Sequence, residues 1–294
     1  MSSSFRLSVI TDEISQDLGR ALEVASTEFG LAWVELRTLW NKNILRLEAA
    51  ELAEVCRLLH HYDLQVNNIA SPLFKVDWPG APLSQFSPKG RPQATSDFNF
   101  AEQQEVLERS LELAAMFKTN LVRCFDFWRL QDPAPYREAM DAKLSEAAAQ
   151  AGKKGVTLIL ENEHECNTAT CAEILRTLAA VNSPHFQLNW DPGNAAKLGD
   201  AAFPQGYQLL PKNRIAHVHC KNAERDPAGS GYRWAPVENG LVDWAAQFRA
   251  LKNDNYRAAV SLETHWRGTG TAEQASRECW AQMRAALQSA GALS

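Results

Sequence analysis

The sequence has no long uninterrupted run of apolar residues and no excess of positive charge. No window approaches the roughly 20 apolar residues that a membrane-spanning helix needs, and the first residues do not form a basic segment followed by an apolar stretch. The formal net charge is −5, whereas binding to a nucleic-acid backbone depends on basic surface. We therefore expect a cytoplasmic protein that binds neither a membrane nor a nucleic acid.

Cysteine pairs are also lacking. The six cysteines are scattered along the chain, and no two form the C-x-x-C spacing that is typical of zinc knuckles and redox motifs. Cys166 and Cys171 are near enough in sequence to pair locally, but a disulfide framework belongs to oxidising compartments. The pattern favours free thiols in a reducing compartment.

Strand-like and helix-like segments alternate along the whole chain, without a low-complexity linker or an internal repeat. Segments with apolar residues three and four apart, such as that containing Leu52, Val55 and Leu59, predict amphipathic helices. Eight short segments between them read as strands: 5–10, 33–36, 65–70, 120–125, 157–161, 186–191, 215–219 and 259–263. Eight strands alternating with helices form a closed parallel barrel of about 250 residues. We predict an α/β fold, a (β/α)8 TIM barrel, as a single domain over residues 1–294.

Each of the last four predicted strands ends in a residue of a type that binds metal ions. The four residues are Glu161, Asp191, His219 and Glu263. Catalytic groups of such barrels gather at the carboxyl ends of the strands, and the alternation of side chains along each strand directs all four toward one axis. A single terminal acid is most often a surface charge or a helix cap. Four in succession predict a divalent-cation site.

Three carboxylates and one imidazole form a mixed oxygen and nitrogen donor set. Such a set suits one manganese or magnesium ion, accepts cobalt and does not exclude zinc. Four protein ligands leave positions open for two adjacent substrate oxygens, such as the carbonyl and hydroxyl of a ketose. The ion would polarise the carbonyl, and a carboxylate could then remove the neighbouring C–H proton to give a metal-stabilised enediolate.

Glu161 and Glu263 are the candidate acid/base pair for this proton transfer. They end the fifth and eighth strands, which we expect on opposite sides of the ring, so that they could flank the substrate. In the alternative interpretation both residues are ligands only, and a water or another side chain moves the proton.

Three residues of the seventh predicted strand, His217, His219 and Lys221, share one face. Because His219 lies nearer the C-terminal end, we assign the metal to it and place His217 one layer deeper. Lys221 and Arg225 could steady a substrate oxyanion or phosphate, although a solvated surface charge is the default for either residue alone.

Several of the nine tryptophans fall at or just after predicted strand ends. Trp128, Trp234 and Trp266 are among those that could stack on the C–H face of a sugar there, and core packing at the barrel mouth is the alternative. In the first half of the chain, Glu35, Arg37 and Arg123 occupy inward positions near strand ends. We expect buried ion pairs for the two arginines.

Two connections, 75–99 and 222–242, are longer than most βα loops and rich in proline and glycine. Both follow predicted strands, so both belong to the end of the barrel where the candidate ligands lie. They could form lids that exclude water, or they could be surface loops without a role.

Four motifs resemble those of the sugar phosphate isomerase/epimerase family, the xylose isomerase-like barrels. The motifs are Leu160-Glu161-Asn162, Trp190-Asp191-Pro192-Gly193-Asn194, His217-Val218-His219-Cys220-Lys221-Asn222 and Leu262-Glu263-Thr264-His265-Trp266. The resemblance extends over nearly the whole chain. It implies Glu161, Asp191, His219 and Glu263 as ligands of one divalent metal, Glu161 and Glu263 as the acid/base pair, and Arg225 near the substrate.

The chain also departs from the family pattern. Asn194 occupies the position of a substrate-contacting histidine in the ketohexose epimerases, and Val237-Glu238-Asn239-Gly240 stands where the family has a Gly-Glu-Gly turn. Both departures indicate a subgroup with its own substrate, for which Asn194 remains a candidate substrate-binding residue.

The predicted function is a metal-dependent isomerase or epimerase of a small carbohydrate, phosphorylated or not, acting as a monomer or a homo-oligomer. A dehydratase acting on a keto-sugar or keto-inositol begins with the same proton abstraction, so the residues do not separate the two. A phosphodiesterase of the endonuclease IV type needs many histidines for three zinc ions, and the first four strands contain none. A silent sugar-binding barrel would be expected to lack at least one ligand.

Overall fold

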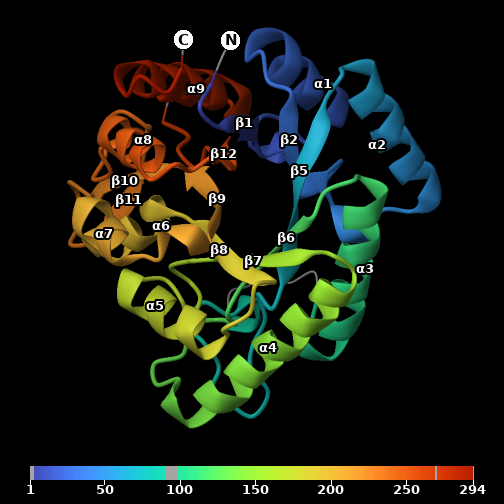
Figure 1. Cartoon of the computed structure of the whole chain (residues 1–294), viewed down its shortest axis with the longest axis vertical. Helices are drawn as coiled ribbons and strands as arrows, with labels where there is room; N and C mark the ends of the chain where they lie inside the picture. The colour runs from blue at the N-terminus through green and yellow to red at the C-terminus, as the bar shows by residue number, and fades with distance from the viewer. Residues whose placement is uncertain (1–2, 91–97, 269, 294) are drawn as a thin grey trace.

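Eight parallel strands form the central sheet, in the order β1-β12-β9-β8-β7-β6-β5-β2. The computed structural model describes residues 3–90, 98–268 and 270–293. The strands are β1 (Arg6–Val9), β2 (Trp33–Leu36), β5 (Gln65–Leu73), β6 (Leu121–Cys124), β7 (Thr157–Glu161), β8 (Phe186–Trp190), β9 (Ile215–Cys220) and β12 (Ala259–Leu262). Helices alternate with these strands and surround the ring (Figure 1). The predicted (β/α)8 barrel is confirmed, and every predicted strand is present.

The ring closes at a seam between β1 and β2, where a continuous ladder is lacking in the described residues. Ile10 forms an isolated parallel bridge with Glu35, and the hydroxyl of Thr11 donates to the carbonyl oxygen of Glu35 at 3.3 Å. On its other side, β1 pairs with β12 over its full length. The barrel is therefore nearly closed, and Glu35 lies at the seam.

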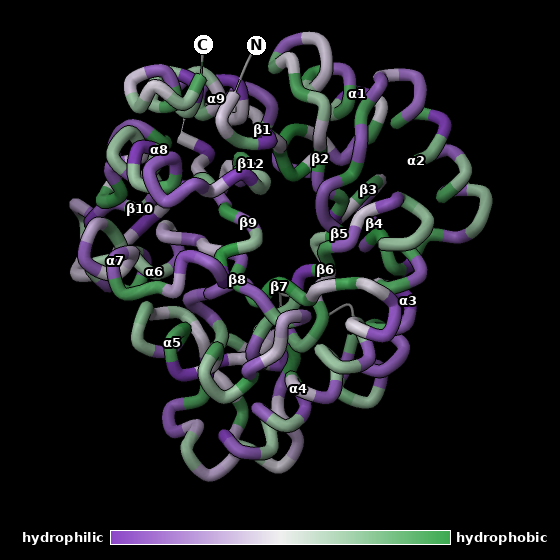
Figure 2. Tube along the Cα trace, viewed as in Figure 1, coloured by the Kyte–Doolittle hydropathy of each residue, from purple (hydrophilic) through white to green (hydrophobic). Residues whose placement is uncertain are grey.

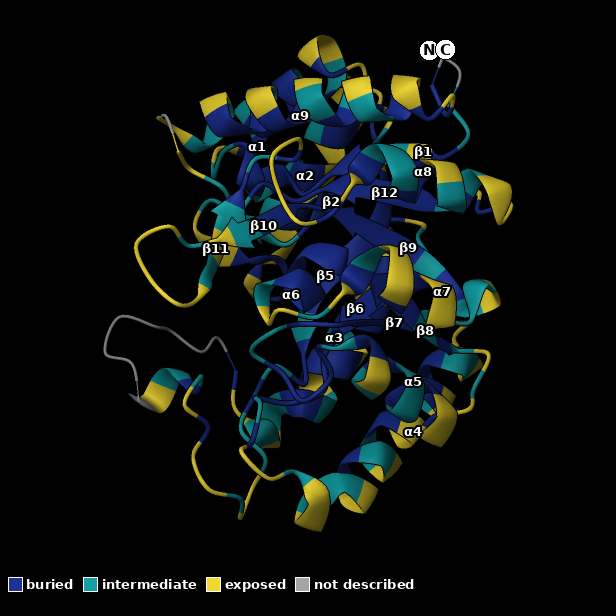
Figure 3. Cartoon of the chain, turned by 90° about the vertical axis from the view of Figure 1, so that its left-hand side faces the viewer, coloured by how far each residue is buried: buried dark blue, intermediate teal, exposed yellow. Residues whose placement is uncertain are grey.

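The helices follow the amphipathic pattern of the sequence. They are α1 (Leu18–Glu23), α2 (Ala49–His61), α3 (Gln103–Met116), α4 (Arg137–Lys153), α5 (Cys171–Ala180), α6 (Pro192–Lys197), α7 (Tyr207–Leu209), α8 (Trp244–Asn253) and α9 (Ala272–Ser289). Hydrophobic and hydrophilic residues alternate along them (Figure 2), and their buried sides face the strands (Figure 3). In α2 the buried residues are Leu52, Val55 and Leu59, each of which stabilises the fold by about 1.5–3 kcal/mol when fully buried.

Across the described part of the chain, none of the helices combines the length and apolar character needed to cross a membrane. All six cysteines are free, so Cys166 and Cys171 do not pair.

The two long connections differ in structure. In the first, Trp78 packs edge-on against Phe100 and Phe127, with ring centroids 5.3 and 4.8 Å away. Residues 91–97 of this connection, including Pro92, lie outside the described residues. The second connection contains an antiparallel hairpin of β10 (Asn222–Arg225) and β11 (Tyr232–Ala235), which projects from one side of the barrel (Figure 3).

The side chain of Asn222 fixes the base of this hairpin. Its amide donates to the carbonyl oxygens of Val237 and Val242, both at 2.9 Å, and its oxygen accepts from the amide of Val242 at 3.0 Å. A Cβ atom at Gly240 would lie only 2.1–2.6 Å from the Asn222 side chain. The glycine of the Val-Glu-Asn-Gly turn is therefore required by this close approach.

Candidate metal centre

The four predicted ligands converge at the carboxyl ends of β7, β8, β9 and β12. One ligand atom from each of Glu161, Asp191, His219 and Glu263 lies within 4.8 Å of the others. All four side chains are at most 2% exposed. The structure therefore brings together the four residues that were predicted from their positions at strand ends.

The Trp-Asp-Pro-Gly-Asn motif positions Asp191. Its Oδ1 caps α6 by accepting from the backbone amide of Asn194 at 2.9 Å, with Pro192 in the first turn. Asn162 binds the Asp191 backbone at both ends, accepting from its N–H at 2.8 Å and donating to its carbonyl at 2.7 Å. A Cβ at Gly193 would lie 2.9 Å from the Lys221 carbonyl oxygen, so only glycine fits. Asp191 thus directs Oδ2 into the cluster.

Each glutamate has one oxygen bound to an arginine and the other near His219. Arg123 donates to Glu161 Oε2 at 3.0 Å, and Arg37 donates to Glu263 Oε1 at 2.9 Å. His219 Nδ1 lies 3.5 Å from Glu161 Oε1 and 3.2 Å from Glu263 Oε2. The expected buried ion pair is confirmed for Arg123, whereas Arg37 pairs with Glu263 while remaining partly exposed.

These contacts set the ionisation of the two glutamates. Burial raises the pKa of each carboxyl group, but Arg123 beside Glu161 and Lys221 beside Glu263 outweigh burial, so the pKa of each is lowered. Both are carboxylates at neutral pH and can accept a proton.

Lys221 lies inside the acid cluster. Its Nζ is 2.6 Å from Glu263 Oε2, 2.9 Å from Asp191 Oδ2 and 3.9 Å from Glu161 Oε1. Burial lowers the pKa of Lys221, but Asp191 and Glu263 raise it well above its usual value. The default interpretation of Lys221 as a solvated surface charge is wrong.

Asp191 is the least satisfied of the three acids. Burial raises its pKa to about 7 even though Lys221 opposes the shift. Its Oδ2 accepts no well-aligned hydrogen bond among the described residues, although the ammonium of Lys221 lies 2.9 Å away. Oδ2 is the atom of Asp191 that faces Glu161, His219 and Glu263.

A divalent cation fits this donor set. His219 Nδ1 lies 3.5, 3.7 and 3.2 Å from one oxygen each of Glu161, Asp191 and Glu263. Ligands at about 2.1 Å from one ion are separated by roughly 3.0–3.4 Å in octahedral or tetrahedral geometry. Asp191 Oδ2, which is fully buried and accepts no well-aligned hydrogen bond among the described residues, faces the same centre.

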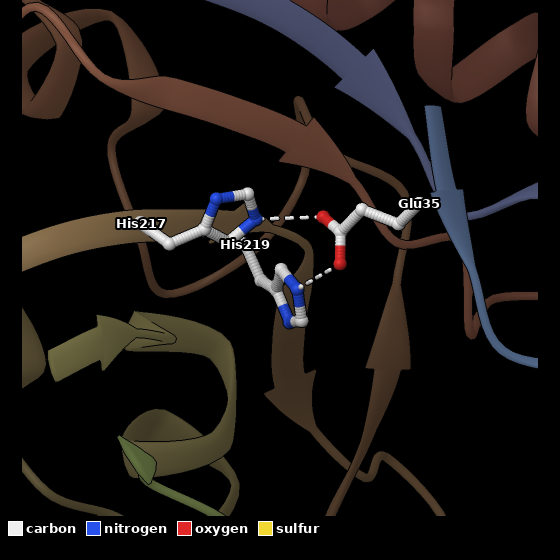
Figure 4. Close-up of side chains that lie close together, drawn as sticks. All are labelled: Glu35, His217 and His219. Atoms are coloured by element: carbon white, nitrogen blue, oxygen red, sulfur yellow. Dashed lines mark hydrogen bonds and ion pairs between the residues drawn. The ribbon is translucent and has the colours of Figure 1, made fainter. Parts of the chain in front are cut away.

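The second histidine of the strand lies deeper, as predicted. His217 Nε2 is 2.6 Å from Glu35 Oε1, and Glu35 Oε2 is 3.4 Å from His219 Nε2 (Figure 4). His217 is therefore one step removed from the cluster.

The remaining predicted substrate residues are placed differently. Asn194 is buried in the cluster and donates to Glu161 Oε1 at 3.2 Å. Trp128 is buried 5.3 Å from the ammonium of Lys75, and Trp266 packs beside Gly268. Arg225 is exposed, with its guanidinium 5.6 Å over the Tyr232 ring. The structure adds Asn194 to the buried cluster and does not add Arg225.

Trp234 of β11, one of the tryptophans expected near the ends of predicted strands, lies next to the cluster. Its ring centroid is 5.0 Å from Lys221 Nζ, 5.0 Å from the ring of His265 and 5.6 Å from the ring of His164. The hairpin thus places an aromatic face beside the candidate centre, and the hairpin itself was not predicted from the Pro- and Gly-rich segment.

Near Trp234, Glu163 ion-pairs with Lys75 at 3.0 Å and with His164 at 2.5 Å. Sequence reasoning did not select Glu163. It follows Glu161 by two residues, so the alternation of side chains along a strand could have placed both on the same face.

Comparisons with known proteins agree with this geometry. The model of the xylose isomerase-like TIM barrel family matches residues 24–288, so the chain belongs to this family. No curated protein matches the chain.

Three similar solved structures share the fold. The probable 3-DHS dehydratase AsbF from Bacillus anthracis has 19% identity and a TM-score of 0.69, over 95% of this chain and 98% of that chain. A xylose isomerase-like barrel from Mycobacterium smegmatis in complex with magnesium has 17% identity and a TM-score of 0.68, over 100% of both chains. An L-ribulose 3-epimerase has 19% identity and a TM-score of 0.65, over 98% of this chain and 96% of that chain.

Proposed function

We propose that this chain is a divalent-metal-dependent isomerase or epimerase of a sugar or keto-sugar, built as one barrel domain. The observation that carries the proposal is the convergence of three buried carboxylates and one imidazole at the carboxyl ends of four adjacent strands. The oxygen-rich set favours manganese or magnesium, and the barrel from Mycobacterium smegmatis was solved with magnesium.

Glu161, Asp191, His219 and Glu263 would hold the metal. When bound there, a divalent cation supplies polarisation of a substrate carbonyl, which acidifies the adjacent C–H bond. Glu161 and Glu263 exchange the proton at that carbon, since both are ionised and both are anchored by an arginine. Lys221 donates a hydrogen bond to a substrate oxygen, and Trp234 limits access of water.

The two glutamates do not stand on diametrically opposite strands, contrary to the expectation from the sequence. Along the ring, two strands, β8 and β9, separate β7 from β12 on one side and four on the other. Both carboxylates instead lie near His219 Nδ1, at 3.5 and 3.2 Å.

Dehydration of a keto-sugar or keto-inositol is the second candidate. The buried ammonium of Lys221, 2.6 Å from Glu263, favours it, because a proton donor beside the base could protonate a departing hydroxyl group. The solved structure of a probable dehydratase with the same fold is consistent with this reaction.

One experiment tests both reactions. Ketoses and keto-inositols, free and phosphorylated, are incubated with the manganese-loaded protein in deuterium oxide and followed by NMR. Isomerisation or epimerisation places deuterium on the carbon next to the carbonyl and conserves the hydroxyl count, whereas dehydration removes one hydroxyl. Absence of both deuterium incorporation and product formation across the panel would contradict the proposal.

A further inference from the structure

Glu35, His217 and His219 form a fully buried group inside the barrel (Figure 4). Glu35 extends from β2 at the seam, and the two histidines extend from β9. All three are 0% exposed. Glu35 therefore reaches from the closing edge of the barrel to the strand that carries the candidate metal ligand.

The two nitrogens of His219 face different carboxylates, and the side-chain nitrogen of Asn189 lies near both, 3.4 Å from Nδ1 and 3.2 Å from Nε2. Nδ1 lies 3.2 Å from Glu263 Oε2, and Nε2 lies 3.4 Å from Glu35 Oε2. An imidazole binds a metal only through a nitrogen without a proton. Since the carboxylate of Glu35 can only accept, it favours the tautomer with the proton on Nε2 and leaves the lone pair of Nδ1 for the metal.

Glu35 is itself held in place. Its Oε1 is 2.6 Å from His217 Nε2, and its Oε2 accepts from the Asn68 amide at 2.9 Å. Both carboxyl oxygens of the fully buried Glu35 therefore face nitrogen partners. His217 and the amide of Asn68 restrict rotation of the Glu35 carboxyl group.

The three residues do not form a second metal site. The 2.6 Å between His217 Nε2 and Glu35 Oε1 is a hydrogen-bond distance, shorter than the roughly 3.0–3.4 Å that separates two ligands of one ion. The group is a hydrogen-bonded support beneath the candidate centre.

We propose that Glu35 is a positioning residue that sets the tautomer and orientation of His219, so that Nδ1 is presented to a divalent cation. This inference rests on the proposed metal centre. It assigns a role to a residue of β2, outside the ligand set, and predicts which ring nitrogen binds the metal.

The test combines the Glu35→Gln variant with Ser8→Ala as its matched control. Glutamine keeps the shape of Glu35 but has one acceptor atom, so it cannot accept from both histidines. Ser8 is equally buried inside the barrel and bonds Ser261 at 2.9 Å and Asn67 at 3.3 Å. Its loss removes interior hydrogen bonds without touching His219.

Two quantities are measured: the Kd for zinc, by competition with a chromophoric chelator, and the coordinating nitrogen of His219, by 15N NMR of the zinc-loaded protein. We expect zinc bound through Nδ1 with a protected Nε2–H in the wild type. The Kd should rise about 10–100-fold in Glu35→Gln and less than about threefold in Ser8→Ala.

Zinc on Nε2 of wild-type His219 would overturn the inference, and this result does not depend on any variant folding. Equal Kd values for Glu35→Gln and the wild type would also overturn it, while leaving the metal centre intact. If the wild type binds no zinc, manganese or magnesium, the proposed function fails first, and the role of Glu35 fails with it.

Discussion

Glu161 and Glu263 each present one carboxylate oxygen to the cluster while an arginine binds the other. Glu161→Gln and Glu263→Gln should each slow deuterium exchange at the substrate α-carbon by at least about 100-fold, because each change removes a proton acceptor and a ligand charge. Glu173→Gln is the control, since Glu173 of α5 binds Arg129 at 2.6 Å and does not belong to the cluster. If either variant exchanged deuterium at the wild-type rate, the glutamate replaced in it would not be the base.

Lys221 binds the same oxygens that would hold the metal. Lys221→Met should destabilise the metal-free protein, because three buried carboxylates lose a cation, and it should enlarge the rise in Tm that manganese produces. Lys197→Met is the control: Lys197 lies 5.3 Å from the Trp234 ring and has no carboxylate partner among the ion pairs of the described residues. An equal or smaller manganese-induced rise in Lys221→Met would argue against competition between the ammonium and the metal.

The raised pKa of Asp191, about 7, predicts how metal affinity depends on pH. Below pH 7 the metal must displace a proton from Asp191, so the affinity for manganese should fall as the pH decreases. Calorimetry in buffers of different ionisation enthalpy should detect release of at least one proton for each metal bound at pH 6. A Kd that stays constant from pH 5.5 to 7.5 would contradict this linkage.

The sequence predicted that these four residues meet at one end of the barrel, because each ends a recognisable strand. It could not predict their partners. Arg123 reaches Glu161 because β6 and β7 are neighbours, whereas Arg37 reaches Glu263 across the seam. Lys221 packs closely against Gly193, where a Cβ atom would lie 2.8 Å from the Lys221 side chain. The sequence shows Gly193 only as a glycine after a proline.

The β10–β11 hairpin is the element that brings Trp234 to the centre. Gly240→Ala would place a methyl group against Asn222, so we expect a loss of about 1–3 kcal/mol in the free energy of unfolding. It should also speed proteolysis within the hairpin and raise KM.

Gly231→Ala is the matched control in the same hairpin, since a Cβ there meets nothing within 4 Å. Thermal unfolding and limited proteolysis should separate the two variants. Similar behaviour of both would show that Asn222 does not hold the hairpin.

The eight barrel strands were predictable as elements, but the hairpin was not. Its two strands have four residues each and lie within a segment rich in proline and glycine, which resembles a loop. Their pairing depends on the Asn222 side chain and on packing beside the barrel mouth. These interactions connect residues that no sequence pattern links, so the hairpin could not be predicted from the sequence.

At the scale of the whole molecule, metal binding should stabilise the native state. Manganese at 100 times its Kd should add about 2.7 kcal/mol to the free energy of unfolding if it does not bind the unfolded chain. Chelation should reverse the gain, and Asp191→Asn should remove most of it. Unfolding curves that coincide with and without manganese would contradict a centre built by the folded barrel.

The pairing of β1 with β12 has a consequence for synthesis on the ribosome. Ser8 and Ser261, which bond each other inside the barrel, are 253 residues apart, and α1 and α9 are joined by the ion pair of Arg20 with Glu273 at 2.7 Å. The nascent β1 has its full-length ladder partner only after β12 has emerged from the exit tunnel. Of the barrel strands, β1 would therefore need chaperones that shield unpaired strand edges for the longest time.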